Sequence, residues 1–391
     1  MSLTHALFGK NESDLKLQNL FQKYYSSWSL PAVDKLQSRE IGFIPFFGTM
    51  TRHRSFNDVR ELSHFVSNVV PRHIYYSSAY YEYPEERVMK DKKWLGAELI
   101  FDLDADHIPG ASKMTYEQIL KEVKKHTHRL IFEFLLGDIG LEEKDLKVFF
   151  SGGRGYHVHV VSDWIYSLSS DARREIANYV RGEGFSPADL RRAMLETPSK
   201  MSGWKKRIDD QVVNFYTILN KSDQYAEILL KVFGTEKKIS SYVENLNKII
   251  AGKSVKKIEV FRTEGIEKYQ YMDANDQLMF SKIMDSVISD QQCEIDEPVT
   301  TDIHRLIRMP QSLHGKSGLI VKPIHIDEFE SFDPLIDARV PEFSNQELTV
   351  NLPRDFGMSF GGVTYKLSEG INKLPGDFSV FLVATKIANF V

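Results

Sequence analysis

The hydrophobic period of this chain changes twice, and this change constrains its fold more than any other feature. Up to about residue 161 the chain contains short aromatic and β-branched runs punctuated by glycine, which are typical of strands. From residue 171 helical spacing dominates, and after residue 294 short strand-like runs return. The pattern predicts an α+β (α/β) fold with a largely antiparallel or mixed sheet, divided into a sheet domain at 1–185, a helical insertion at 186–289 and a return to the sheet at 290–391.

Capping residues and apolar stripes mark the predicted helices. Ser169 or Ser170 can cap a helix that Gly182 ends, and Ser186-Pro187 opens the next one. Two stripes at helical spacing follow, and core packing explains both. They are Ile239, Tyr242, Val243, Leu246, Ile249 and Ile250, then Leu278, Met279, Ile283, Met284, Val287 and Ile288.

Composition bounds the class of protein. With 391 residues and 42% hydrophobic content the chain can bury a sizeable core, as one large domain or two. We expect no membrane partner and no secretion, because no apolar run approaches about 20 residues and the amino terminus lacks a signal pattern. The single cysteine, Cys293, excludes an internal disulfide, so a cytoplasmic location is expected. The net charge of -4 lacks the basic excess usual in nucleic-acid binders, although the clusters at 124–129, 205–207 and 256–257 can face phosphates or simply solvent.

An acidic strand is the first motif that carries chemistry. In A-E-L-I-F-D-L-D-A-D a period of two places Asp102, Asp104 and Asp106 on one face, opposite an apolar face. Neighbours on one face lie about 7 Å apart, so the carboxylates repel one another and favour a cation such as Mg²⁺ or Mn²⁺. An isolated D-x-D is more often a solvated edge strand, but the apolar opposite face favours a buried sheet position and hence the metal site.

A glycine-rich turn, S-G-G-R-G-Y-H-V-H, follows the next apolar strand. Its glycines let backbone amides approach a bound group, and Ser151, Arg154 and His157 add donors for an anion. The turn has neither the Walker ending nor the dinucleotide-binding fingerprint. From the turn alone, a hairpin with a surface arginine and half-buried His157 and His159 is an equally good interpretation.

A third element, D-E-P-V-T from Asp296 and then R-L-I-R-M-P-Q-S-L-H-G-K-S-G, makes the pattern specific. In this order the three motifs closely resemble those of the catalytic small subunit of archaeal and eukaryotic DNA primases. R-E-I-G-F from Arg39 and R-H-I-Y-Y-S-S-A-Y-Y from Arg72 resemble the amino-terminal blocks of that family. The resemblance extends to about Pro323 and is weakest in the helical insertion and in the last seventy or so residues.

The resemblance implies a mixed α/β catalytic domain on an RNA-recognition-like sheet. It implies a DNA-dependent primase, a nucleotidyltransferase that makes short RNA primers for replication by two-metal-ion catalysis, with DNA primers left open. The implied partners are single-stranded DNA, nucleoside triphosphates and a large subunit in a heterodimer. That subunit carries the iron–sulfur cluster of the family, which a chain with one cysteine cannot hold.

The resemblance also assigns roles to residues. The implied metal ligands and catalytic residues are Asp102, Asp104 and Asp296, and the implied triphosphate-binding residues are Ser151, Arg154, His157, Arg308 and His314. The residues alone do not select Asp296 over Glu294 or Glu297. Asp302, Arg305 and Lys316 are plausible neighbours for which a surface ion pair is at least as good an interpretation.

One departure concerns zinc. Members of this family usually carry a cysteine-rich zinc module after the acidic strand, but residues 107–146 contain no cysteine and only His107, His126 and His128. Structural zinc is therefore not expected. Residues 121–134 fit a helix, on which histidines two positions apart diverge by about 200°. We expect apolar packing in its place, by Val123, Leu130, Ile131, Phe134 and Leu135.

Three alternatives remain open at this point. The main one is a primase-polymerase of plasmid or repair type, which shares the D-x-D and S-x-x-x-x-x-H themes. L-I-F-D-L-D also resembles haloacid-dehalogenase-type phosphatases, but Asp106 stands where those enzymes have threonine. The third is a DNA-binding scaffold without catalysis, against which the retained aspartates argue.

Overall fold

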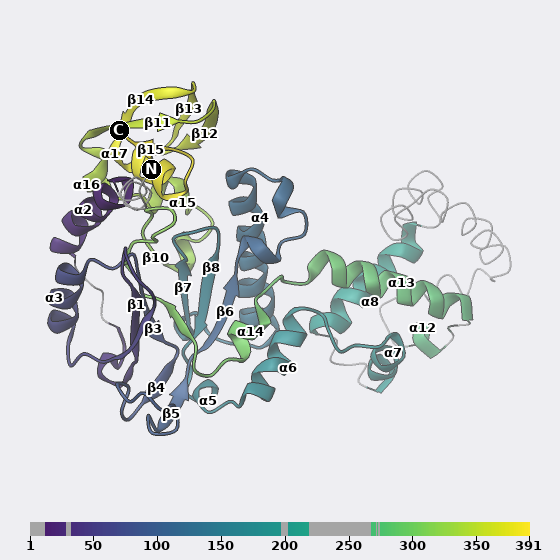
Figure 1. Ribbon diagram of the computed structural model, residues 1–391. Helices are drawn as coiled ribbons and strands as arrows, with labels where there is room; N and C mark the ends of the chain where they lie inside the picture. Colours follow the sequence, from purple (N-terminus) through teal and green to yellow (C-terminus); the bar gives the residue numbers. More distant parts are fainter. Residues whose placement is uncertain (1–11, 29–32, 197–201, 219–266, 271, 273) are drawn as a thin grey trace, which may run out of the picture. The chain divides into compact units, whose positions relative to one another are not determined.

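The structure, a computed structural model, describes residues 12–28, 33–196, 202–218, 267–270, 272 and 274–391 (Figure 1). It divides into two compact units. Unit 1 comprises Met1–His128, Leu141–Ala177 and Glu294–Val391, and unit 2 comprises Arg129–Gly140 and Asn178–Cys293. The domain boundaries placed at 185/186 and 289/290 stay predictions. The predicted stripe from Ile239 to Ile250 and the basic pair Lys256-Lys257 lie outside the described residues.

The first sheet of unit 1 is covered by two helices. It contains β1 (Ile41–Ile44), β2 (Thr51–Arg54), β3 (His73–Ser77) and β9 (Leu306–Arg308), in the order β2-β1-β3-β9. Helices α2 (Glu12–Ser26) and α3 (Val59–Val69) lie on its outer side (Figure 1). Phe21 and Leu62 from these helices share a core with Ile41 and Ile74 of the sheet.

The second sheet of unit 1 supports the acidic strand. It contains β6 (Leu99–Leu103), β7 (Leu146–Phe150), β8 (Tyr156–Val160) and β10 (Lys322–Ile324), in the order β10-β7-β8-β6. Helix α4 (Tyr116–Arg129) lies on the side away from α2 and α3 (Figure 1). Every strand pairing among the described residues is antiparallel. The predicted α+β architecture is confirmed.

Shorter elements complete the region around the sheets. The strands β4 (Ala79–Tyr81) and β5 (Trp94–Ala97) form a separate pair. The short α-helices are α5 (Asp163–Tyr166), α14 (Glu297–Thr301), α15 (Pro334–Asp337) and α16 (Pro341–Ser344). Single 3₁₀ turns occur at Leu36–Ser38, Ala105–His107, Ala111–Lys113, Glu143–Asp145 and Ile326–Glu328.

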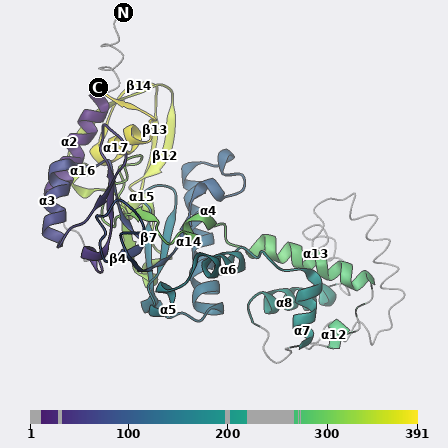
Figure 2. The ribbon, with the colours of Figure 1, turned by 60° about the horizontal axis from the view of Figure 1, so that its bottom comes forward.

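The carboxyl-terminal segment of unit 1 forms two small sheets and one buried helix. Strands β11 (Glu347–Leu352), β14 (Gly370–Pro375) and β15 (Asn389–Phe390) pair in the order β14-β11-β15, and β12 (Phe356–Phe360) pairs with β13 (Val363–Leu367). Every residue of α17 (Gly376–Ala384) is buried. Both views show α17 next to α2 (Figures 1 and 2), and the two helices share one hydrophobic core.

The described part of unit 2 is helical. It contains α7 (Pro187–Glu196), α8 (Gly203–Ile218), α12 (Glu267–Gln270), α13 (Ala274–Gln291) and a π-helix at Leu130–Asp138, while α6 (Ser170–Val180) runs across the boundary with unit 1. The predicted helix starts near Ser170 and Pro187 are confirmed, and Gly182 ends α6 with a left-handed φ of 66°. On α13 the predicted stripe is buried at Met279, Ile283, Met284 and Val287, but Leu278 is half exposed. None of the described helices is long and apolar enough to cross a membrane.

Apolar residues pack in the segment for which the sequence raised the question of zinc. Helix α4 contains His126 and His128, whose rings have separate partners. His126 Nδ1 accepts the Glu294 N–H at 3.2 Å, and His128 Nε2 lies 2.8 Å from Glu330 Oε1. The five apolar residues predicted to pack here are fully buried, namely Val123, Leu130, Ile131, Phe134 and Leu135.

Candidate active site

The acidic motif lies at the end of β6, which is shorter than predicted. The strand stops at Leu103, and Asp104 accepts the Ala105 N–H at 2.7 Å to cap the turn that follows. Asp106 lies in that turn and is exposed, so the predicted alternation of side chains does not reach it. The opposite face is buried as predicted, because Leu99, Phe101 and Leu103 are at most 1% exposed.

Asp296 lies directly beside Asp102. It occupies the position before α14, its N–H donates to the Asp102 carbonyl at 2.9 Å, and its Oδ2 lies 3.8 Å from His107 Nε2. Glu297 instead pairs with Arg174 at 3.1 Å. Two acidic segments almost 200 positions apart are therefore brought to one place by a backbone hydrogen bond.

The electrostatic environment of this group of aspartates favours a bound cation. Burial raises the pKa of Asp102 to about 7, and the negative charges of Asp104 and Asp296 add to the rise, against the opposing effect of Arg308. Within the described ranges no three acidic, histidine or cysteine side chains converge into a ready metal cage. The donor chemistry nevertheless fits Mg²⁺ or Mn²⁺, because clustered carboxylates are hard oxygen ligands whose repulsion a divalent ion relieves.

The glycine-rich turn packs tightly against two other segments. It joins β7 to β8, and the Ser151 N–H donates to the Gly155 carbonyl at 2.9 Å. Gly152 has a left-handed φ of 79°, and a Cβ there would lie 2.6 Å from His314 Cβ. A Cβ on Gly155 would lie 2.2 Å from the Leu103 carbonyl oxygen. Only glycine lets the turn approach both neighbours.

A second turn, at residues 312–318, packs against the glycine-rich turn. The Ser317 hydroxyl donates to the Gly152 carbonyl, and His314 Nδ1 lies 3.1 Å from the same hydroxyl. The His314 ring is buried and contacts the edge of the His73 ring at 5.2 Å between centroids. The G-G-R-G and S-L-H-G-K-S-G motifs therefore form one rigid wall.

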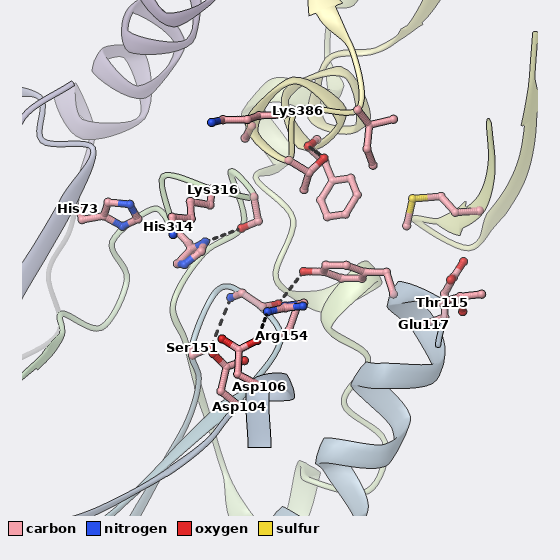
Figure 3. A pocket seen from close by; sticks show the side chains of 18 of the residues that line it. His73, Asp104, Asp106, Thr115, Glu117, Ser151, Arg154, His314, Lys316 and Lys386 are labelled. Carbon is pink, nitrogen blue, oxygen red and sulfur yellow. Dashed lines mark hydrogen bonds and ion pairs between the residues drawn. The ribbon is translucent and has the colours of Figure 1, made fainter. Parts of the chain in front are cut away.

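This wall faces a cavity of about 1030 Å³ in unit 1. Five predicted site residues line it, namely Asp104, Ser151, Arg154, Arg308 and His314. Figure 3 shows Asp104, Ser151, Arg154 and His314 gathered around it. Lys316, a plausible neighbour from the sequence, also lines the cavity, as do residues to which the sequence assigned no role in the site, among them Arg72, His73, Tyr116 and Lys386.

Positive charge is concentrated along the cavity. Arg154 Nη2 donates to Asp106 at 2.7 Å, whereas the buried Arg308 Nε has no hydrogen-bond partner among the described residues. Burial and the charges of Arg308, Arg72 and Lys316 lower the pKa of His73 to about 3. Burial and Arg308 likewise hold the pKa of His314 well below its usual value. Both rings are neutral at pH 7, and the arginines and lysines favour an anionic ligand.

His157, Asp102 and Asp296 are not among the residues that line the cavity. His157 is 1% exposed, its Nε2 lies 3.7 Å from Asp102 Oδ1, and its Nδ1 is buried without a partner in the part of the chain that is described. The ring is therefore fully buried behind Asp102, and not half-buried as one interpretation had it. Of the plausible neighbours, Lys316 lines the cavity, whereas Asp302 and Arg305 do not.

Some cavity residues gave no signal in the sequence. Tyr116 donates its hydroxyl to the Gly153 carbonyl at 2.6 Å, and its ring meets the edge of Phe381 at 5.2 Å. Lys386 follows α17, and Phe356 and Met358 belong to β12. They are isolated residues in segments without a motif, and only the tertiary fold brings them together. Arg72 and His73 stand in a block that carried the resemblance, but no role was assigned to them.

An acidic cluster next to a cation-lined cavity defines an enzyme that acts on phosphate esters. A family profile described as "DNA primase small subunit" matches residues 101–326. The DNA primase small subunit PriS of Picrophilus torridus is 47% identical, over 96% of this chain and 98% of its own length. The protein of the same name from Thermoplasma volcanium is 38% identical over 97% and 98%, and that from Methanocella arvoryzae is 36% identical over 96% and 98%.

The chain belongs to the DNA primase small subunit family. The resemblance seen in the motifs is confirmed. The chain is therefore a catalytic primase subunit of DNA replication, a nucleotidyltransferase, and the phosphatase, scaffold and plasmid-type alternatives are not favoured. The family depends on divalent metal in general.

Proposed function

We propose that this chain polymerises nucleoside triphosphates into RNA primers on a single-stranded DNA template, with catalysis in the cavity of unit 1. The observation that supports this most directly is the position of Asp102, Asp104 and Asp296 next to a cavity lined by Arg154, Arg308 and Lys316. A polymerase needs carboxylates for metal ions and cations for a triphosphate, and the two sets are adjacent here.

In this proposal the three aspartates hold two ions, Mg²⁺ or Mn²⁺. When bound, such ions stabilise negative charge on the attacking 3'-hydroxyl oxygen and on the leaving oxygen. Asp102 suits this task because burial and the charges of Asp104 and Asp296 raise its pKa despite the opposing effect of Arg308, so a divalent ion would stabilise its ionised form. Asp104 must leave its cap on Ala105 or share an oxygen with it.

The protein residues bind and orient the triphosphate. Ser151 and Arg154 come from the first turn, Arg308 from the end of β9 and His314 from the second turn, and all four line the same cavity. His314 Nδ1 donates to the Ser317 hydroxyl, which itself donates to the Gly152 carbonyl, so His314 Nε2 donates to a phosphate only when the ring is protonated, a form that the negative charge of a phosphate favours. Because these donors are held by the two locked turns, they are arranged before the nucleotide arrives, which reduces the entropy lost on binding.

The remaining roles extend this proposal. His157 stays a predicted nucleotide-binding residue, but its position behind Asp102 favours a role in orienting that carboxylate. A large subunit is the proposed partner in a heterodimer, with any iron–sulfur cluster on that subunit. A cytoplasmic location also stays a prediction.

Primer synthesis on single-stranded DNA with labelled ribonucleotides or deoxyribonucleotides tests the proposal, with Mg²⁺ or Mn²⁺ supplied. We expect polymer from the wild type and a loss of at least about 100-fold in Asp102→Asn and Asp104→Asn, since a metal ligand contributes several kcal/mol to the barrier. Asp327→Asn is the matched control, because Asp327 is 76% exposed and does not line the cavity.

A second experiment distinguishes residues that bind the nucleotide from residues that bind the template. Arg154→Ala and His314→Ala should raise the apparent KM for nucleotide by roughly 10- to 100-fold, because charge-assisted and buried hydrogen bonds to phosphate are lost. Affinity for single-stranded DNA should stay within about twofold, since the proposal assigns both residues to the nucleotide and neither to the phosphates of the template. Folded aspartate variants with near-normal synthesis would refute the metal assignment, and lost DNA affinity with unchanged KM would assign the cations to the template.

A further inference from the structure

Lys386 lies on the cavity wall, in a segment to which no motif assigns a function. It follows directly on α17, and Figure 3 shows it on the opposite side of the pocket from Asp104. Its backbone is well fixed. The Lys386 N–H donates to Val383 at 3.0 Å, and the next two N–H groups donate to Leu382 at 2.8 and 3.1 Å.

The backbone of Lys386 is in a conformation that ordinarily requires glycine. Its φ is 63°, in the left-handed region that most often holds glycine directly after a helix. A side chain at such a position is strained, and strain of this kind is concentrated at functional sites. Five other non-glycine residues in the described part of the chain share this left-handed region, so the strain singles out Lys386 only together with its place on the cavity wall.

The charge of Lys386 is not neutralised by the described residues. No acidic group within the described ranges forms an ion pair with Lys386 or with Lys316. The cations that line the cavity are Arg72, Arg154, Arg308, Lys316 and Lys386, against three carboxylates, Asp104, Asp106 and Glu117. Asp106 already pairs with Arg154, and Arg72 lies 3.5 Å from Asp14. Lys316 and Lys386, which form no ion pair among the described residues, lie on the side of the cavity away from Asp104 (Figure 3).

We propose that Lys386 binds the distal phosphates of the nucleoside triphosphate and the pyrophosphate that leaves, an inference that rests on the proposed function. The aspartates mark where the bond to the α-phosphorus forms, so the β- and γ-phosphates extend away from them. The 3'-hydroxyl oxygen forms a bond to the α-phosphorus and gives its proton to solvent, while the bond between the α-phosphorus and the α–β bridging oxygen breaks, so the departing pyrophosphate carries the negative charge. The Lys386 ammonium faces that charge from the opposite wall.

The backbone strain makes a clean test possible. Lys386→Gly removes the cation and relieves the strain, whereas Lys386→Arg keeps the cation. Lys93→Gly is the matched control, since Lys93 is also left-handed, with φ of 50°, but its side chain is 57% exposed and does not line the cavity. We measure thermal stability and, by calorimetry, binding of MgATP, inorganic pyrophosphate and AMP.

Lys386→Gly should keep or raise the melting temperature and weaken binding of MgATP and pyrophosphate about tenfold, the value of one charged hydrogen bond. AMP binding should not change, Lys386→Arg should stay within about threefold of the wild type, and Lys93→Gly should bind like the wild type. Unchanged MgATP and pyrophosphate binding in Lys386→Gly would overturn the inference. So would lost affinity for single-stranded DNA with normal MgATP binding. A wild type that makes no primers refutes the proposed function, but pyrophosphate binding still decides the role of Lys386.

Discussion

The Asp102 carboxylate is placed where its ionised form is unfavourable. Burial, Asp104 and Asp296 raise its pKa to about 7 from an ordinary value of 3.8. The folded chain therefore holds this proton more tightly than the unfolded chain does. Between pH 4 and pH 7, roughly, the folded state binds more protons, so the contribution of Asp102 to stability decreases as the pH rises.

The upward shift of the Asp102 pKa leads to a prediction about how the stability of the protein depends on pH. Without divalent metal, the melting temperature of the wild type should fall relative to that of Asp102→Asn, which cannot ionise, as the pH rises from 5 to 8; the comparison removes the opposite effect of His73 and His314, whose lowered pKa is common to both proteins. Mg²⁺ or Mn²⁺ at pH 8 should raise the melting temperature of the wild type more than that of the variant, because ligand binding stabilises the folded state. Thermal unfolding in chelator and in metal measures both effects. Parallel pH curves for the two proteins would show that Asp102 titrates normally.

The candidate residues that sequence predicted are those that stand in motifs. Asp104, Ser151, Arg154, Arg308 and His314 line the cavity, and Asp296 touches Asp102, although its choice depended on the resemblance. Tyr116 and Lys386 could not be predicted, because a single tyrosine or lysine has no pattern around it. The burial of His157 could not be predicted either, since a strand residue next to a turn can face either way.

At the level of elements, the turn between β7 and β8 controls the site. It meets the end of β6 through Gly155 and the second turn through Gly152. Both contacts are to parts that do not move easily, because one is a backbone carbonyl and the other a buried ring. The geometry of the anion-binding wall therefore depends on two positions without a side chain.

Gly155→Ala should destabilise the protein by about 1–3 kcal/mol, because the added methyl overlaps the Leu103 carbonyl and the strand end must shift. Gly153→Ala is the control in the same turn, since its nearest neighbours are His314 ring atoms at 3.3 Å. Denaturant unfolding of the three proteins gives the free energies. Equal stability of the two variants would mean that the turn relaxes away from β6.

The strands of the second sheet were predictable because they are apolar, β-branched and bounded by glycine. The end of β6 was not, because Asp104 stops the strand by capping its own turn, which a period-two pattern does not reveal. The strand β12 is partly exposed, and its sequence belongs to no motif. The contribution of Phe356 and Met358 to the cavity wall was therefore also missed.

At the scale of the whole molecule, the lack of cysteine in residues 107–146 leads to a prediction about the zinc content of the protein. Purified without a metal-binding tag, the chain should contain no tightly held zinc, because His126 and His128 have other partners on α4 and residues 107–146 lack cysteine. Elemental analysis of the folded protein measures this. One zinc per chain, released only on unfolding, would reveal a ligand set that the sequence does not suggest.

The residues that line the cavity extend along the sequence from Ile44 to Ile387. A ribosome adds residues in order, so a growing chain has the glycine turn and the acidic strand long before it has α17 and Lys386. The nascent protein cannot form a complete nucleotide pocket until residue 387 has left the exit tunnel. Contacts this distant in sequence also form slowly, because a long loop must close first. Chains that stop short of α17 therefore lack the part of the cavity wall that α17 and the residues after it contribute.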